Sequence, residues 1–138
     1  MRAILIEDRV IQRIVGLQEL RKVVTCLAPA TAEELRETAN GCDVIFADRV
    51  MDDRWLEARN DFIARNPQAV VIEWSAFDDD MNDEHTKLPR RDKKIVKTGR
   101  GGELVAEVER LRASQPGLKT NSRLLEAVCA FLGLAVTR

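Results

Sequence analysis

The sequence predicts an α/β domain built on a five-stranded parallel β-sheet, and three observations lead to this fold class. Short apolar stretches of strand length alternate with longer stretches whose apolar residues recur at helical spacing. The strand candidates are apolar almost throughout, as expected for strands that helices cover on both faces. Repeated alternation of strand and helix favours parallel pairing through right-handed crossovers.

The composition is that of an ordinary globular domain. Its 138 residues suit one domain, which would bury roughly two thirds of its unfolded surface. The 22 basic and 23 acidic residues nearly cancel, so we expect neither nucleic acid nor a membrane as a partner. No apolar run reaches membrane-spanning length and no signal-peptide layout is present, so we expect a cytoplasmic protein. Cys26, Cys42 and Cys129 lack metal-ligand spacing, and we expect buried, reduced thiols.

The first half of the chain predicts three strands and two helices. Strands are expected at residues 3–6, 23–27 and 44–47, and helices at 10–21 and from 31 to about 39. Apolar residues at helical spacing predict the first helix, and Thr31 with Glu34 forms a capping box that begins the second. Gly41 and the polar stretch 48–54 bound the third strand.

The second half continues the alternation with one interruption. Strands are expected at residues 69–74 and 95–96, and helices at 54–65 and after 99–102. Between Asp78 and Lys94, where a fourth helix is due, the only large aliphatic side chains are Met81 and Leu88. This segment therefore predicts a mobile loop or a poor, degenerate helix. The single histidine, His85, is expected to be a solvated loop residue there.

The last residues predict a separate element. We expect a domain at residues 1–113 and, at 114–138, a linker followed by an extra C-terminal amphipathic helix. Its apolar face comprises Leu124, Leu125, Val128, Phe131 and Leu132. This helix either packs on its own domain or contacts a partner, which includes a second copy in a homodimer, and both alternatives stay open.

Polar side chains end four of the five predicted strands. Glu7 and Asp8 follow the first strand, Asp48 follows the third, Ser75 the fourth and Lys97 the fifth. Because the carboxyl ends of parallel strands meet at one edge, these side chains are expected to converge. Three carboxylates together require a cation, and oxygen ligands of this kind suit Mg²⁺. The alternative for Asp48 is that it only ends its strand and caps the next helix.

With this arrangement the sequence resembles a response-regulator receiver domain over about residues 1–113. The resemblance rests on four motifs in order, Ile4–Asp8, Asp43–Asp48, Val70–Ala76 and Ile95–Lys97. Residues 8, 48, 75 and 97 are separated by 40, 27 and 22 positions, close to the spacing of that family. It implies a flavodoxin-like, doubly wound fold.

The resemblance also implies roles for the acidic residues. Asp48 would accept a phosphoryl group from a sensor histidine kinase or a phosphotransfer protein. Glu7, Asp8 and Asp48 would hold Mg²⁺, with the backbone carbonyl of Val50 as a further ligand. The enzymatic activity implied is at most autophosphotransfer and autodephosphorylation of the domain itself.

Lys97 and Ser75 complete the implied site. Lys97 and the metal would neutralise charge on the transferring oxygens, and the Ser75 hydroxyl would bind the new phosphoryl group. The 25 residues after Ala113 are too few for a DNA-binding domain, so output is expected through contact with another, unidentified protein.

Several positions depart from the family pattern. Thr98 replaces the proline that usually follows the lysine, and Lys94 occupies the usual aromatic switch position. The loop after Asp48 lacks the usual proline and glycine, and the fourth helix is degenerate. These departures favour a second hypothesis, a pseudo-receiver that keeps the fold and acts only as an interaction module.

A third hypothesis comes from another class of protein. A Toprim-like, Mg²⁺-dependent nucleic-acid enzyme also uses a glutamate after its first strand and clustered aspartates after a later one. Glu7, Asp48 and Asp52 match this pattern loosely, whereas Ser75 and Lys97 have no role in it.

Overall fold

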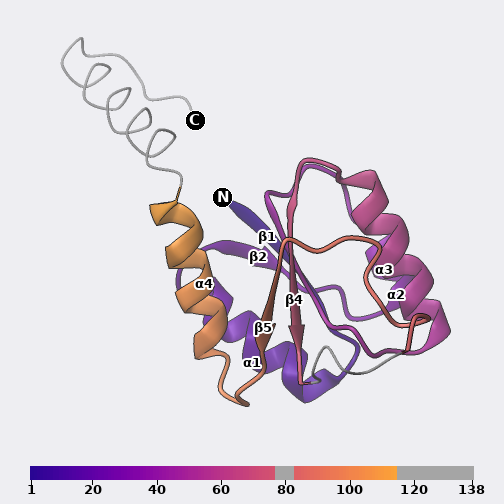
Figure 1. Cartoon of the computed structure of the whole chain (residues 1–138), viewed down its shortest axis with the longest axis horizontal. Coiled ribbons are helices and arrows are strands. Elements are labelled where there is room, and N and C mark those ends of the chain that lie inside the picture. Colours follow the sequence, from indigo (N-terminus) through magenta and orange to yellow (C-terminus); the bar gives the residue numbers. More distant parts are fainter. Residues whose placement is uncertain (77–82, 115–138) are drawn as a thin grey trace, which may run out of the picture. The chain divides into compact units, whose positions relative to one another are not determined.

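The computed structural model describes residues 1–76 and 83–114 (Figure 1). The chain divides into two compact units after Val105. The first unit, Met1–Val105, contains the whole β-sheet and every residue of the predicted site. The predicted boundary near residue 113 stays a prediction, and the predicted helix at 122–132 lies outside the described residues.

The first unit is built on one five-stranded sheet. Its strands are β1 (Arg2–Ile6), β2 (Thr25–Leu27), β3 (Val44–Ala47), β4 (Val70–Ser75) and β5 (Lys93–Val96). They lie in the order β2-β1-β3-β4-β5, and all neighbouring pairs are parallel. This order is that of the flavodoxin-like doubly wound fold, so the predicted fold class is confirmed.

Within residues 1–76 and 83–114, four helices connect or follow these strands. They are α1 (Val10–Arg21), α2 (Ala32–Glu37), α3 (Asp53–Arg65) and α4 (Gly102–Ala113). Thr31 caps α2 as predicted, because its Oγ1 accepts a hydrogen bond from the Glu34 amide at 3.1 Å. The Glu34 carboxylate accepts from the Ala30 amide at 2.9 Å, one residue before the cap. The α3 helix begins in a similar way at Asp52, whose side chain accepts from the Trp55 amide at 3.1 Å.

The core packs on both faces of the sheet. In Figure 1, α2 and α3 lie together on one side of the sheet and α1 lies on the other. Buried side chains of α2 and α3, including Leu35 and Phe62, pack with Ile4 and Ile45 of the sheet. On the opposite face Gly16 of α1 lies against Trp74 of β4. Covered on both faces, β3 is apolar throughout, whereas β4 also contains the buried polar residues Glu73 and Ser75.

Two strand boundaries differ from the prediction by two residues, and the others agree within one residue. Strand β2 begins at Thr25 rather than at residue 23, because the Val23 and Val24 amides still donate to the Leu20 carbonyl at the end of α1. Strand β5 extends back to Lys93, two residues earlier than predicted, and Lys93 pairs with Ile72 of β4. The charged residues at the start of β5 concealed this part of the strand from an apolar pattern.

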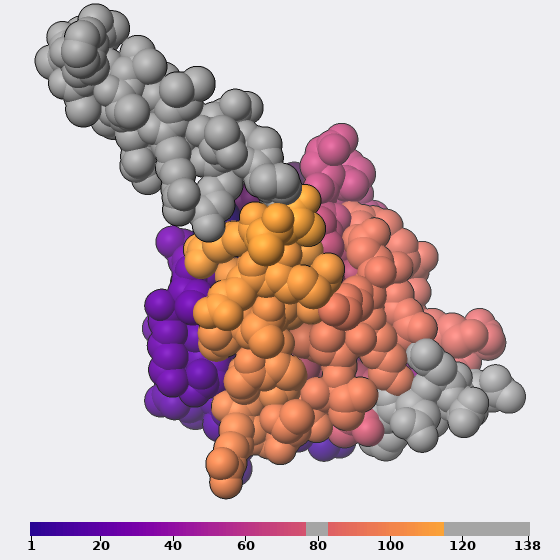
Figure 2. Space-filling view, turned by 60° about the vertical axis from the view of Figure 1, so that its left-hand side comes forward, coloured from indigo at the N-terminus to yellow at the C-terminus, as the bar shows by residue number. Residues whose placement is uncertain are grey.

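The connection from β4 to β5 contains no helix in its described part, residues 83–92. Residues 84–86 form a turn, and most side chains from Asp83 to Asp92 are exposed, His85 among them. Figure 2 shows the surface formed by this stretch, coloured salmon. The prediction of a degenerate fourth helix therefore holds for the described residues, whereas residues 77–82 lie outside them.

Two further predictions concern burial and membranes. Cys26 and Cys42 are buried, as predicted, and Cys129 lies outside the described residues. Burial raises the pKa of both thiols, that of Cys26 to about 12. Among residues 1–76 and 83–114, none of the helices has the length and apolar character needed to cross a bilayer.

Candidate functional site

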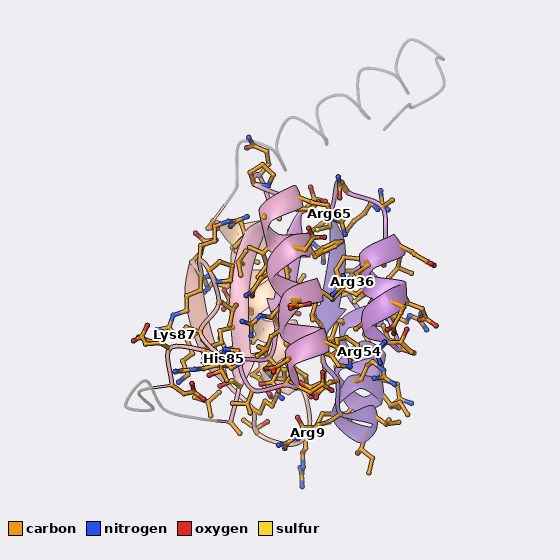
Figure 3. All side chains as sticks on the ribbon, turned by 90° about the vertical axis from the view of Figure 1, so that its right-hand side faces the viewer. Arg9, Arg36, Arg54, Arg65, His85 and Lys87 are labelled. Carbon is orange, nitrogen blue, oxygen red and sulfur yellow. The ribbon has the colours of Figure 1, made fainter. Side chains whose placement is uncertain are left out.

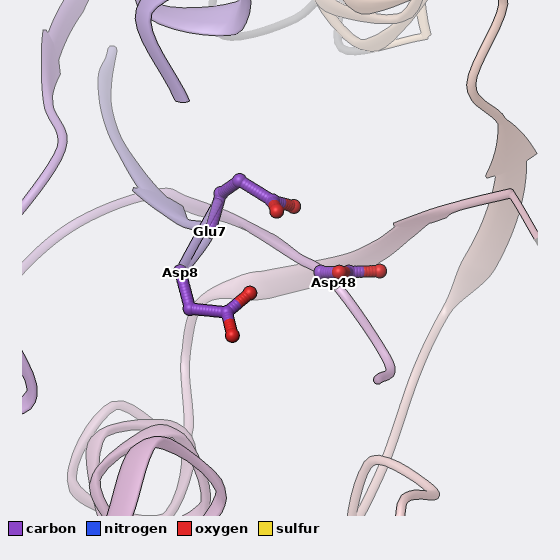
Figure 4. Close-up of side chains that lie close together, drawn as sticks. All are labelled: Glu7, Asp8 and Asp48. Atoms are coloured by element: carbon purple, nitrogen blue, oxygen red, sulfur yellow. The ribbon is translucent and has the colours of Figure 1, made fainter. Parts of the chain in front are cut away.

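The acidic residues predicted to converge lie together at the carboxyl edge of the sheet. Ile6 at the end of β1 pairs with Ala47 at the end of β3, so Glu7 and Asp48 follow neighbouring strands. The Asp48 amide donates to the Ile6 carbonyl at 3.0 Å, which continues the ladder into the site. One carboxylate oxygen each from Glu7, Asp8 and Asp48 lies within 4.8 Å of the others (Figure 4).

Lys97 supplies a positive charge to this cluster. Its Nζ lies 2.6 Å from Glu7 Oε2 and 3.3 Å from Asp48 Oδ2. It also donates to Gln12 Oε1 of α1 at 2.5 Å and lies 4.7 Å from the centre of the Trp74 ring. The Lys97 side chain is only 7% exposed, so these contacts replace most of its hydration.

Burial and mutual repulsion change the acidity of the cluster. Glu7 is fully buried, and burial together with the Asp48 charge raises its pKa to about 7 although Lys97 acts in the opposite direction. The pKa of Asp8 is also raised, first by burial and then by Asp48. A bound cation would stabilise the ionised form of these buried carboxylates, because it would offset the repulsion between them.

The donor atoms fit Mg²⁺. Asp8 Oδ1 is buried and has no hydrogen-bond partner among the described residues, which is an unfavourable state for a carboxylate oxygen. A divalent cation would satisfy this atom together with the oxygens of Glu7 and Asp48. A few carboxylates and several waters are the ligands that Mg²⁺ prefers.

Asp48 does not cap the following helix. The cap of α3 is Asp52, whereas Asp48 Oδ1 accepts a hydrogen bond from the Arg49 amide at 2.8 Å. Asp48 is buried with 3% of its surface exposed. The capping alternative for Asp48 is therefore wrong, and its second carboxylate oxygen faces Lys97.

The other two predicted site residues lie at the same edge. Ser75 is the last residue of β4, is fully buried and pairs with Val96 of β5. Its carbonyl accepts from the Lys97 amide at 3.1 Å. Val50 follows β3 by three residues and is half-buried. The roles assigned to the Ser75 hydroxyl and the Val50 carbonyl stay predictions.

The residues at two positions that depart from the family pattern, Thr98 and Lys94, lie close to carboxylate groups in the structure. Thr98, which replaces the usual proline, donates from its amide and from Oγ1 to the Glu103 carboxylate. Trp74 Nε1 donates to the same carboxylate at 3.0 Å. Lys94, at the aromatic switch position, lies 3.9 Å from the buried Glu73 carboxylate. Both departures therefore serve local pairing of charged and polar groups.

Sequence reasoning missed the basic residues behind the site. Arg49 and Arg59 are 2% and 0% exposed, and Arg59 donates to the Asp48 carbonyl at 3.1 Å. Arg13 of α1 donates to the Glu7 and Asp8 carbonyls. Arginine in a helix or loop is ordinarily a surface residue, and no local pattern distinguishes these.

Comparison with known proteins supports the fold. No protein-family model and no curated protein matches the chain by sequence. The structure is similar to the BeF₃-activated receiver domain of DrrB, with a TM-score of 0.64, 17% identity and coverage of 79% of this chain and 94% of the other.

Two further similar structures contain the response regulator TrrA of Thermotoga maritima. One is its complex with Mg²⁺-BeF, with a TM-score of 0.62, 20% identity and coverage of 80% and 97% of the two chains. The other is its complex with the histidine kinase ThkA, with a TM-score of 0.57, 18% identity and coverage of 80% and 97%. This chain therefore has the fold of a response-regulator receiver domain.

Proposed function

We propose that this chain is an atypical response regulator that accepts a phosphoryl group on Asp48 in a Mg²⁺-dependent reaction. The observation that carries the proposal is the grouping of three carboxylates and the Lys97 ammonium at the carboxyl edge of a receiver-fold sheet. Such a group binds a divalent cation and an incoming phosphoryl group in one place.

In the proposed reaction an Asp48 carboxylate oxygen attacks the phosphorus of a phosphohistidine. An O–P bond forms, the N–P bond breaks, and the imidazole leaves with the electron pair and takes up a proton. Mg²⁺ held by Glu7, Asp8 and Asp48 would supply positive charge against the transferring oxygens. Lys97, which already lies 3.3 Å from Asp48 Oδ2, would stabilise the same charge from the other side.

The donor and the output partner belong to the same proposal. A sensor histidine kinase or a phosphotransfer protein would supply the phosphoryl group, and the similarity to TrrA, which forms a complex with a histidine kinase, supports this choice. Output would pass through contact with another protein or a second copy of the chain. The C-terminal helix predicted at 122–132 remains the candidate contact.

One observation favours a pseudo-receiver as the second candidate. Glu7 has a pKa near 7 and a 2.6 Å contact with Lys97, so a proton and the ammonium can neutralise much of the cluster without a metal. A pseudo-receiver would therefore remain folded and would show no metal dependence.

Tryptophan fluorescence separates the two candidates. We would titrate Mg²⁺ into a Trp55→Phe background, where Trp74 beside Lys97 is the remaining tryptophan, and then add acetyl phosphate or beryllofluoride. A working receiver gives a saturable change with Mg²⁺ and a second change with either compound. With acetyl phosphate, which is the phosphoryl donor, it also gains the mass of one phosphoryl group.

The Asp48→Asn variant is the matched control. It keeps the shape of the side chain and removes its charge, so the donor response and the mass increase should disappear. A folded wild-type protein that shows neither metal binding nor a mass increase would establish the pseudo-receiver instead.

A further inference from the structure

Arg59 of α3 is a fully buried arginine directly behind the acceptor aspartate. A guanidinium group is expensive to remove from water, and arginine is almost never fully buried unless its donors are paired. Burial lowers the pKa of Arg59 to about 10, with the Asp48 and Glu73 charges acting in the opposite direction. Arg59 is therefore a buried cation at neutral pH, so the structure must compensate it with good contacts.

Those contacts converge on the backbone around the site. Arg59 Nη1 donates to the Asp48 carbonyl at 3.1 Å and to the Arg49 carbonyl at 2.9 Å. Its Nη2 donates to the Lys87 carbonyl at 3.0 Å, in the connection from β4 to β5. Its Nε donates to Asn60 Oδ1 at 3.0 Å. One rigid, planar group thus joins α3, residue 87 and the loop between β3 and α3 (residues 48–52), here called the acceptor loop.

Arg49, which lies in the acceptor loop, is a second buried arginine that donates hydrogen bonds to the connection from β4 to β5. Its Nε donates to Thr86 Oγ1 at 3.2 Å, and its Nη2 donates to the Asp83 carbonyl at 3.1 Å. The 83–88 segment contains no helix whose apolar face could pack on the sheet. Instead, the buried guanidinium groups of Arg49 and Arg59 hold it against the loop after β3. These hydrogen bonds take the place of the apolar packing that a helix would give.

We propose that Arg59 is a positioning residue for phosphoryl transfer to Asp48. It holds the carbonyls of Asp48 and Arg49, and this fixes the peptides that orient the acceptor side chain and the Val50 carbonyl. Through the Lys87 carbonyl it keeps the 83–88 segment in register with the same loop. The proposal rests on the proposed function, and the experiment below distinguishes failure of one from failure of the other.

A matched control lies on the same helix. Arg65 also donates to backbone carbonyls, those of Thr38 and Arg36 after and within α2. Figure 3 shows Arg65 at the opposite end of the domain from Arg9, which follows the acidic pair, whereas His85 and Lys87 mark the segment that Arg59 holds. Replacing Arg65 therefore removes a similar set of hydrogen bonds far from Asp48.

The experiment compares Arg59→Met, Arg59→Lys and Arg65→Met in the full-length chain. The readouts are the maximum rate of phosphorylation by acetyl phosphate, the donor concentration at half-maximum, the Mg²⁺ dissociation constant and the urea midpoint. We expect Arg59→Met to lower the maximum rate at least tenfold and to weaken Mg²⁺ binding at least threefold. Arg59→Lys should recover part of the rate, and Arg65→Met should stay within twofold of the wild type despite a lower urea midpoint.

The other outcomes overturn the proposal in different ways. A wild-type protein that is never phosphorylated overturns the proposed function and the role of Arg59 together. An active wild type with Arg59→Met within twofold of its rate overturns the role of Arg59 alone. Equal losses in Arg59→Met and Arg65→Met would assign Arg59 to general stability. If Arg59→Met does not fold, Arg59→Lys decides by the same criteria.

Discussion

The protonation state of Glu7 sets the net charge of the acidic cluster near neutral pH. It is fully buried, contacts Lys97 at 2.6 Å and has a pKa near 7, against an ordinary value of 4.5. In the metal-free protein a substantial fraction of Glu7 therefore holds a proton at neutral pH. A metal ion needs the ionised carboxylate, so Mg²⁺ binding must displace that proton.

This acidity predicts the pH dependence of Mg²⁺ binding. Below pH 7 the affinity should rise about tenfold per pH unit as Glu7 ionises, and above pH 7 it should level off. Calorimetry in buffers of different ionisation enthalpy should detect proton release near pH 6.5. Glu7→Gln should weaken binding and remove the proton release, and proton release that persists in Glu7→Gln would assign it to another group.

The same shift affects the stability of the metal-free protein with the opposite sign. Between pH 4.5 and about 7 the folded state binds more protons than the unfolded state, because its Glu7 pKa is the higher one. The free energy of unfolding therefore falls as the pH rises through this window. Urea denaturation at several pH values should show that fall in the wild type and a smaller one in Glu7→Gln.

At the scale of single residues, sequence reasoning identified the groups that end strands and missed the groups that support them. Glu7, Asp8, Asp48 and Lys97 were predictable because the parallel sheet brings strand ends to one edge. Arg59 was not, because its hydrogen bonds go to backbone carbonyls whose positions depend on the folded loops. No spacing along the chain encodes such contacts.

At the scale of elements, α1 packs closely on the sheet at Gly16. A Cβ atom at this position would lie 2.9 Å from Leu5 Cδ2 and about 3.0 Å from the Trp74 ring. The absence of a side chain therefore lets the helix pack against β1 and β4. The position also matters for the site, since the same Trp74 ring lies beside Lys97.

Gly16→Ala tests this close packing. In a solvent-exposed helix the change would stabilise by about 1 kcal/mol, because alanine has the higher helix propensity. Here we expect a net destabilisation of roughly 1–2 kcal/mol from overpacking. Urea denaturation measures the difference, with Gln18→Ala on the exposed face of α1 as the control. A more stable Gly16→Ala protein would show that the helix can move outward at little cost.

Element boundaries show where sequence patterns lose information. The predicted ends of β1, α1 and β3 agree with the structure within a residue, because apolar period and polar boundaries coincide there. Strand β5 was underestimated because Lys93 and Lys94 occupy its first two positions. Backbone pairing with β4 decides that strand, and pairing partners distant in sequence are invisible to a local pattern.

At the scale of the whole molecule, the fold is retained at low sequence identity. The three solved structures described above are 17–20% identical to this chain, yet the strand order and the acidic edge were predictable from the chain alone. A parallel sheet needs only apolar strands in sequence, and its chemistry needs only a few polar residues after them.

The order of the strands has a consequence for self-association. Strands β2 and β5 are the outer strands of the sheet, and an outer strand can pair with a strand of another molecule. Strand β2 is only three residues long, and β5 begins with two lysines. Short length and positive charge both disfavour strand addition.

We therefore expect Lys93→Val to increase aggregation when the protein is warmed toward its unfolding temperature, as measured by light scattering. Lys22→Val, which places the same side chain on an exposed residue outside the sheet, is the control. Equal aggregation of the two variants would contradict a specific effect of the edge. If Lys93→Val aggregates more than Lys22→Val, the lysines that hid β5 from the sequence pattern also limit the addition of strands from other molecules.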